Sequence, residues 1–302
     1  MVPTRPPVVA SFSKAGREHR RPKVNQDRVL HASLKTSGLD VWAVFDGHGP
    51  DGEKLARWLV QSLPKAFNSI FDADSAAEPG FVTATVPAVF EILDSDLSNE
   101  LGVDVTTMSG ATATVALHKG GKLLVAGVGD TRAILGGLDK DQIQVMTTIH
   151  NPASPLESAR ILRMGGEVKV LPDEPPIAET GEGRVFSRGG WSPGLAVARA
   201  FGDLSAKVVG VVVTPDMRTA DTASTEDDDG SKRQALIIAS DGVWDVIDDA
   251  TALQLCLTAY AARQDAEAAA QTLVDTAREA WEAVVEDPSV AIDDISAVIA
   301  FF

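Results

Sequence analysis

Residues 41–49 read Val-Trp-Ala-Val-Phe-Asp-Gly-His-Gly, and residues 235–242 read Ala-Leu-Ile-Ile-Ala-Ser-Asp-Gly. In each stretch an apolar run with the length and composition of a buried strand ends on Asp-Gly. Asp-Gly is also the commonest two-residue hairpin turn, but here a loop and a helical pattern follow each pair instead of a second strand. We therefore expect Asp46 and Asp241 at the rim of a rigid sheet, where a bare carboxylate is costly unless a positive group lies beside it.

The rest of the chain carries blocks of strands and long helices. Strand-like runs lie near 41–45, 112–118, 122–128, 132–135, 142–147, 235–239 and 296–302, with a hairpin turn at Gly120-Gly121. Amphipathic helices are predicted near 53–70, 81–101, 249–263 and 265–286, and a short helix near 155–164. Several strands follow one another without an intervening helix, which excludes a simple alternating parallel sheet and favours an α+β layered architecture.

Composition narrows the classes of function. The 302 residues suit one large domain or two small ones, and no stretch approaches the roughly 18–20 uninterrupted apolar residues that span a bilayer. The N-terminus has no apolar leader, and the single cysteine, Cys256, excludes an internal disulfide and fits a reducing compartment. We expect a protein of the cytoplasm, the nucleus or both, with no membrane partner.

The formal net charge is −16, and such a surface repels phosphate backbones, so we expect no nucleic-acid partner. The one basic concentration is the stretch 17–23, which contains Arg17, Arg20, Arg21 and Lys23. A solvated loop, a loop that faces a phosphate and a nuclear-import signal all fit this stretch, and the sequence leaves the three open. The acidity has a second interpretation, namely that acids gather to hold divalent cations.

Further aspartates stand at the edges of predicted elements: Asp27, Asp130, Asp245, Asp293 and Asp294. Carboxylates that meet at sheet rims repel one another and raise one another's pKa unless cations lie between them. Hard oxygen ligands, with few histidines and no thiols among them, select Mg²⁺ or Mn²⁺ over Zn²⁺. Two such ions about 3.5–4 Å apart, bridged by water, make a nucleophile suited to phosphate-ester hydrolysis.

Short motifs follow one another from about residue 25 to the C-terminus. They are Asn25-Gln26-Asp27, Val44-Phe45-Asp46-Gly47-His48-Gly49-Pro50, Ser109-Gly110-Ala111-Thr112-Ala113, Gly129-Asp130-Thr131-Arg132-Ala133, His150-Asn151-Pro152, Pro193 to Asp203, Ala239 to Asp245 and Asp293-Asp294-Ile295-Ser296. In this order and spacing they resemble the metal-dependent serine/threonine protein phosphatases of type 2C. The proline after Asp-Gly-His-Gly and the segment around Phe201-Gly202-Asp203 look most like plant and protist members.

The resemblance implies a four-layer α-β-β-α sandwich, in which two central antiparallel sheets are flanked by helices and metals lie in the cleft between the sheets. It also implies a division of the chain into an N-terminal segment with a basic loop, 1–24, and a catalytic domain, 25–302. Within that domain we expect a flap at about 151–205. The stretch 221–233 carries no apolar periodicity and is predicted to be an exposed acidic loop, and Pro172 to Pro193 is predicted to be irregular.

The resemblance also implies a role for each acid. Asp46 bridges both metals and the Gly47 carbonyl binds one of them, while Asp241 and Asp293 complete the ligands of the other ion. Asp27 orients metal-bound water. Asp130, Asp241 and Asp245 match a third, weaker metal position. His48 corresponds to the general acid that protonates the leaving alkoxide of serine or threonine, which is a poor leaving group.

The sequence departs from the family pattern in three places. The basic residue that usually holds the substrate phosphate is replaced by Pro22, which lies between Arg21 and Lys23. We favour Arg21 slightly over Lys23 for this role, because a guanidinium grips phosphate with two donors. The residue before Asp27 is Gln26, where an acid is usual. His150 stands in a changed segment that we assign to the flap rather than to the metals. Arg199 and Asp203 either pair and brace the flap or take a direct part in catalysis, and the sequence leaves the two open.

We therefore predict a Mg²⁺- or Mn²⁺-dependent phosphatase that acts as a monomer on phosphoserine and phosphothreonine in proteins. A metal-bridging hydroxide would attack phosphorus without a phospho-enzyme. An inactive scaffold of the same fold that regulates a partner is the alternative. A phosphatase with an aspartyl nucleophile would need Asp-x-Asp where this chain has Asp46-Gly47-His48. A thiol nucleophile is disfavoured because Cys256 lies in an apolar helical stripe.

Overall fold

The computed structural model describes residues 6–18, 21–71, 79–137, 142–170, 183–222, 233–285, 287 and 290–302. Two antiparallel sheets form its centre. The first has the strand order β14 (Asp216–Asp221), β7 (Lys122–Val128), β6 (Gly110–Lys119), β5 (Asp40–His48) and β4 (Arg28–Ser33), and β13 (Phe201–Gly202) pairs with β6. The second has the order β1 (Val8–Lys14), β16 (Ile295–Phe301), β15 (Ala235–Ala239), β8 (Arg132–Gly136) and β9 (Gln144–Val145).

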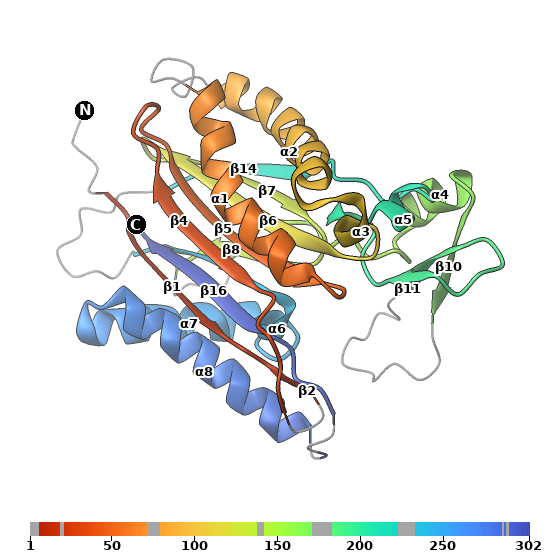
Figure 1. Ribbon diagram of the computed structural model, residues 1–302. Coiled ribbons are helices and arrows are strands. Elements are labelled where there is room, and N and C mark those ends of the chain that lie inside the picture. Colours follow the sequence, from red (N-terminus) through yellow and green to blue (C-terminus); the bar gives the residue numbers. More distant parts are fainter. Residues whose placement is uncertain are drawn as a thin grey trace.

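Helices cover the outer face of each sheet. The helices α1 (Gly52–Ile70) and α2 (Pro79–Leu101) pack on the first sheet, and α7 (Asp249–Arg263) and α8 (Ala266–Val284) pack on the second (Figure 1). A separate apolar layer joins the inner faces of the two sheets. The predicted four-layer α-β-β-α sandwich is therefore confirmed.

The alternation of side chains along β5 decides where its last residues point. Val41, Ala43 and Phe45 pack under α1 and α2, whereas Trp42 and Val44 pack against the second sheet. Successive side chains of a strand face opposite sides of the sheet, so Asp46 continues the row of Trp42 and Val44. The carboxylate is thus directed into the layer between the sheets, at the end where the apolar filling stops.

Smaller elements complete the sandwich. The helices α3 (Val103–Thr106) and α5 (Leu204–Lys207) lie beside α2, and α6 (Asp241–Trp244) follows β15 directly. A short hairpin of β2 (Arg17–Glu18) and β3 (Arg21–Pro22) precedes β4. The predicted flap holds α4 (Pro155–Arg163), β10 (Gly166–Val170), β11 (Gly183–Ser187) and β12 (Pro193–Leu195), which project beyond one end of the sheets (Figure 1).

The structure differs from the sequence predictions in several places. β5 runs through Asp46-Gly47-His48 and pairs there with β6, so this Asp-Gly lies inside a strand and not after it. β11 forms within the stretch predicted to be irregular, because it pairs along its length with β10 and buries Val185. β1 was not predicted, and it pairs along its whole length with β16. Residues 171–182 of the predicted flap lie outside the described residues, and so do residues 223–232 of the predicted acidic loop. Asp221, the first residue of that predicted loop, belongs to β14.

Candidate metal centre

Three of the predicted acids meet at one end of the space between the sheets. Asp46 comes from the end of β5, Asp130 from the turn after β7 and Asp241 from the start of α6. Each offers one carboxylate oxygen, and these oxygens all lie within 4.8 Å of one another. Strands from both sheets therefore deliver carboxylates to a single point.

The electrostatics show that the other predicted acids surround this point. Burial, followed by the charges of Asp27, Asp241, Asp293 and Asp130, raises the pKa of Asp46 well above its ordinary value. Burial and the charges of Asp293, Asp130, Asp245 and Asp27 do the same for Asp241. Without cations, these carboxylates repel one another. A bound divalent ion would remove this repulsion.

The donor set fits a hard divalent cation. Oδ1 of Asp241 is buried and has no hydrogen-bond partner among the described residues, and the same holds for Oδ1 of Asp27. Buried polar atoms are normally paired, so an unpaired carboxylate oxygen calls for an explanation. Carboxylate oxygens alone, without sulfur or imidazole in the cluster, suit Mg²⁺, Mn²⁺ or Ca²⁺.

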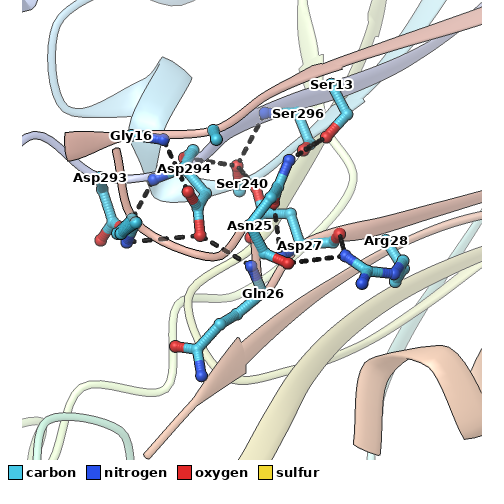
Figure 2. Close-up of polar contacts among 12 residues, drawn as sticks. Ser13, Gly16, Asn25, Gln26, Asp27, Arg28, Ser240, Asp293, Asp294 and Ser296 are labelled. Carbon is cyan, nitrogen blue, oxygen red and sulfur yellow. Dashed lines mark hydrogen bonds and ion pairs between the residues drawn. The ribbon is translucent and has the colours of Figure 1, made fainter. Parts of the chain in front are cut away.

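Asp27 lies beside the cluster and is held by neighbours from both sheets (Figure 2). Its Oδ2 accepts a hydrogen bond of 2.8 Å from Ser240 Oγ, and its backbone N–H donates to Asn25 Oδ1 over 2.9 Å. Burial, followed by the charge of Asp293, raises the pKa of Asp27 to about 7. Ser240 directly follows β15 and Asp27 directly precedes β4, so their contact joins the ends of the two sheets at the site.

The neighbouring acids Asp293 and Asp294 have different surroundings (Figure 2). Asp294 is 2 % exposed, and its carboxylate accepts hydrogen bonds from the backbone N–H groups of Gly16 at 2.7 Å and Gln26 at 2.8 Å. Asp293 is more exposed, and its Oδ1 lies 2.6 Å from Lys23 Nζ. Asp294 therefore fastens backbone segments together. Asp293 is outside the group of three oxygens but lies close enough to raise the pKa of both Asp46 and Asp241.

The two basic candidates for phosphate binding lie in different places. Lys23 reaches the acids, with Nζ 2.6 Å from Asp293 and 3.3 Å from Asp294, and although burial opposes its charge these carboxylates raise its pKa. Arg21 is exposed and lines a separate groove between the β2–β3 hairpin and α8. The geometry thus favours Lys23 over the slightly preferred Arg21.

The glycines of the two Asp-Gly pairs are required by close backbone approach and not by a turn. A Cβ atom on Gly47 would lie 2.4 Å from the carbonyl oxygen of Gly52, and one on Gly242 would lie 2.1 Å from that of Asp294. Neither glycine has a positive φ, so neither pair forms the hairpin turn that its sequence also allows. The remaining predicted ligand, Asp245, is exposed at the end of α6, one turn after Asp241.

The predicted pairing of Arg199 with Asp203 is wrong. Arg199 binds Glu157 of α4 at 2.7 Å and Asp216 of β14 at 3.0 Å. Asp203 instead lies 2.6 Å from the imidazole Nε2 of His48. The brace at the flap is therefore an Arg199–Glu157–Asp216 network, and Asp203 belongs to the site.

Sequence reasoning did not assign Ser240 or His150 to the site, and it left Asp203 between a brace at the flap and a direct part in catalysis. His150 was assigned to the flap, yet its Nδ1 accepts a hydrogen bond from the backbone N–H of Gly129, the residue before Asp130. All three lie far in sequence from the atoms they contact, so no local spacing could reveal the contacts. The one sequence signal for these three residues is that each is a polar residue within an otherwise apolar or glycine-rich segment.

Two other sequence inferences concern the rest of the molecule. Cys256 is fully buried between α7 and the second sheet, and burial raises the pKa of its thiol, which fits packing and not nucleophilic attack. Within the described residues, no helix combines the length and the apolar character that crossing a bilayer requires.

Comparisons with known proteins show the family of this chain. A family model described as "Protein phosphatase 2C" matches residues 17–282. The chain is 31% identical over 280 residues to "Probable protein phosphatase 2C 61" of Arabidopsis thaliana, covering 91% of this chain and 79% of the relative. It is 34% identical over 289 residues to "Probable protein phosphatase 2C 64" of Oryza sativa subsp. japonica, covering 93% of this chain but 63% of that relative.

Among solved structures, a serine-threonine phosphatase 2C from Toxoplasma gondii superposes with a TM-score of 0.73 at 24% identity, covering 99% of this chain and 98% of that one. At this identity the likeness concerns the fold, and it extends over the whole sandwich. The family match, the plant relatives and the meeting of the aspartates lead to the same conclusion. The chain belongs to the protein phosphatase 2C family, whose members are metal-dependent serine/threonine phosphatases.

Proposed function

We propose that this chain hydrolyses phosphoserine and phosphothreonine in proteins at the end of the inter-sheet layer where Asp46, Asp130 and Asp241 meet. The observation that carries the proposal is the approach of their carboxylate oxygens to within 4.8 Å, together with the buried, unpaired Oδ1 of Asp241. Such an arrangement is unfavourable for the protein alone and favourable once hard cations are bound.

Two Mg²⁺ or Mn²⁺ ions are the proposed cofactors, with a third, weaker position. Asp46, the Gly47 carbonyl, Asp241 and Asp293 would hold the pair, and Asp130, Asp241 and Asp245 would hold the third. Bound there, the ions would neutralise the phosphate and lower the pKa of water, so that a nucleophile exists at neutral pH. Asp293 would have to exchange its contact with Lys23 for a metal, and the released ammonium is then available to the substrate phosphate.

The chain's own residues would perform the other steps. Lys23 binds a phosphate oxygen as a point charge. Asp27, fixed through Ser240, accepts a hydrogen bond from water at the site through its unpaired Oδ1. His48 protonates the leaving oxygen of serine or threonine.

The alternative of an inactive scaffold has no support in the site, because every acid that the family pattern assigns to the metals is present in the sequence. Monomeric action in the cytoplasm or nucleus, without nucleic-acid or membrane partners, remains an expectation from composition. Light scattering at micromolar concentration would measure the oligomeric state.

Turnover of a phosphothreonine peptide tests the proposal. The parent protein with Mn²⁺ is expected to release phosphate, EDTA to stop the release, and added Mn²⁺ to restore it. Asp46→Asn is expected to lower kcat by at least about 100-fold, because one bridging charge is lost where charge develops in the transition state. Activity near the parent level in Asp46→Asn, with a circular dichroism spectrum like the parent's, would refute the assignment.

A further inference from the structure

A histidine–carboxylate pair lies at the edge of the metal centre. His48, the last residue of β5, has its Nε2 2.6 Å from Oδ2 of Asp203, a residue 155 positions later in the chain. Asp203 is 4 % exposed and the His48 side chain is 26 % exposed. The carboxylate is therefore almost fully buried, whereas about a quarter of the imidazole surface remains exposed.

The backbone at Asp203 is held in an uncommon conformation. Its φ of 52° lies in the left-handed region, which residues with a side chain rarely adopt and which Asp and Asn tolerate better than most. Its N–H donates to the carbonyl of Ser109 over 2.9 Å, and its own carbonyl accepts from Ala206 and Lys207 at 2.8 and 3.0 Å. The left-handed turn is thus enforced by the surrounding backbone, and it aims the carboxylate at His48.

Helix α2 fixes the same turn from the other side. Asp94 accepts a hydrogen bond of 2.8 Å from the backbone N–H of Gly202 and forms an ion pair with Lys207. Lys207 also donates to the carbonyl of Ala200 over 3.0 Å. One partly buried ion pair therefore holds the residues on both sides of Asp203 in place.

A glycine leaves room for the contact. Gly110 pairs with His48 across β5–β6 and with Gly202 across β6–β13. A Cβ atom at Gly110 would lie 2.0 Å from Oδ2 of Asp203 and 2.6 Å from Nε2 of His48. Any side chain at this position would force the carboxylate and the imidazole apart.

We propose that Asp203 is a positioning residue for the general acid: it holds Nε2–H of His48, so that Nδ1 is the atom that delivers the proton. This inference rests on the proposed function. In the step, a P–O bond forms to the oxygen of the attacking water, the P–O bond to the serine or threonine oxygen breaks, and the electron pair of the broken bond stays on that oxygen. The oxygen takes the proton from Nδ1–H, and a neutral imidazole with its proton on Nε2 remains, bonded to Asp203.

The surroundings of the two ring nitrogens agree with this arrangement. Nε2 is occupied by the carboxylate of Asp203, whereas among the described residues no hydrogen bond within the protein engages Nδ1. A histidine fixed through one nitrogen by a carboxylate, with the other nitrogen directed at the reaction, is a common way to set tautomer and orientation.

Asp203→Asn separates positioning from folding. Asparagine tolerates a positive φ, so the turn is retained, but the charged acceptor for Nε2–H is lost. With saturating Mn²⁺, we expect kcat for a phosphothreonine peptide to fall about 100-fold, the lower end of what general acid catalysis contributes. For p-nitrophenyl phosphate, whose leaving group needs no proton, we expect kcat within about threefold of the parent. His48→Ala is expected to show the same difference between substrates, and the double variant no further loss.

Gly110→Ala tests the same contact with both residues still present, and it should reproduce the selective loss on the peptide. Gly80→Ala is the matched control, because a Cβ there meets no atom within 4 Å. Equal losses on both substrates in Asp203→Asn, or an unchanged peptide kcat, would overturn the positioning role. Failure of the proposed function looks different, because the parent protein itself would then hydrolyse neither substrate.

Discussion

The imidazole Nδ1 of His150 accepts a hydrogen bond from the backbone N–H of Gly129 over 3.1 Å, and the backbone N–H of His150 donates to the Gly129 carbonyl over 2.9 Å. Gly129 has a φ of 93° and begins the turn that carries Asp130 to the metal centre. An Nδ1 that accepts a hydrogen bond carries no proton, so His150 is neutral in this fold. A residue of the segment assigned to the flap therefore positions a proposed metal ligand.

The stability of the fold is expected to fall as the pH falls from 7 to 5, partly because of His150. Burial, and then the charge of Arg199, lowers the pKa of His150 below its ordinary value of 6.5. Below that value the unfolded chain takes up a proton that the folded chain does not, which favours unfolding by at most about 1.4 kcal/mol per pH unit for one proton. Urea unfolding at several pH values measures the slope.

His150→Asn isolates this contribution. The Asn oxygen can replace Nδ1 as the acceptor for Gly129, but it does not titrate, so the slope between pH 7 and 5 should become shallower. His150→Ala should also lose the slope and be less stable than His150→Asn at pH 7, because the buried N–H of Gly129 is left unpaired. An unchanged slope in both variants would contradict the neutral assignment.

Much of the fold could be predicted from the apolar pattern alone. The runs at 41–45 and 235–239 became β5 and β15 because alternate residues of each face an apolar layer on both sides. The sequence did not predict β1, because Ser11, Ser13 and Lys14 are polar and because most residues of this edge strand are only half-buried. It did not predict β11, because the pairing with β10, and not the composition of the segment, makes β11 a strand.

The types of residue at element ends predict which aspartates meet, but not the contacts that each of them makes. Asp46, Asp130 and Asp241 stand at element ends, and sheet rims bring such positions together. The choice between Arg21 and Lys23 depends on the direction in which each side chain points, Arg21 from β3 and Lys23 just after it. The chemistry of the guanidinium group does not predict these directions. The contact of His48 with Asp203 depends on the left-handed backbone conformation of Asp203, which lies 155 residues after His48. No local sequence pattern predicts this contact.

Replacing a metal ligand should stabilise the metal-free protein while abolishing activity. In Asp241→Asn, the cost of burying the charge and its repulsion with Asp293 and Asp130 are removed, so in EDTA we expect Tm to rise by roughly 2–4 °C, equivalent to about 1 kcal/mol. With Mn²⁺ the order should reverse, since the parent gains more from binding. Asp96→Asn, which removes an exposed charge from α2, serves as the control and should change neither value. Equal Mn²⁺-induced shifts in parent and Asp241→Asn would contradict the ligand assignment.

Lys23 and Arg21 can be distinguished by matched variants. Lys23→Met removes the ammonium beside Asp293 and should raise both KM for a phosphopeptide and the inhibition constant of inorganic phosphate about tenfold, the value of one charge-assisted hydrogen bond. Arg21→Met removes the same charge from the separate groove and should change either constant less than twofold. Steady-state kinetics at saturating Mn²⁺ decides, and a larger effect in Arg21→Met would return the role to that residue.

The brace at the base of the flap should contribute strongly to stability. Glu157 is 5 % exposed and binds both Arg199 and Arg160, and its ion pairs hold its pKa below the ordinary value in spite of burial. Glu157→Gln leaves the partly buried guanidinium of Arg199 with one carboxylate, Asp216, so we expect the free energy of unfolding to fall by about 2–4 kcal/mol. Glu167→Gln removes the charge from the partly exposed pair with Lys169 in the same flap and should change the urea midpoint far less, since ion pairs in contact with solvent contribute little. If both variants lost the same stability, the network at Arg199 would be no more than surface charge pairing, and α4 would have to be held against the sheets by its apolar contacts alone.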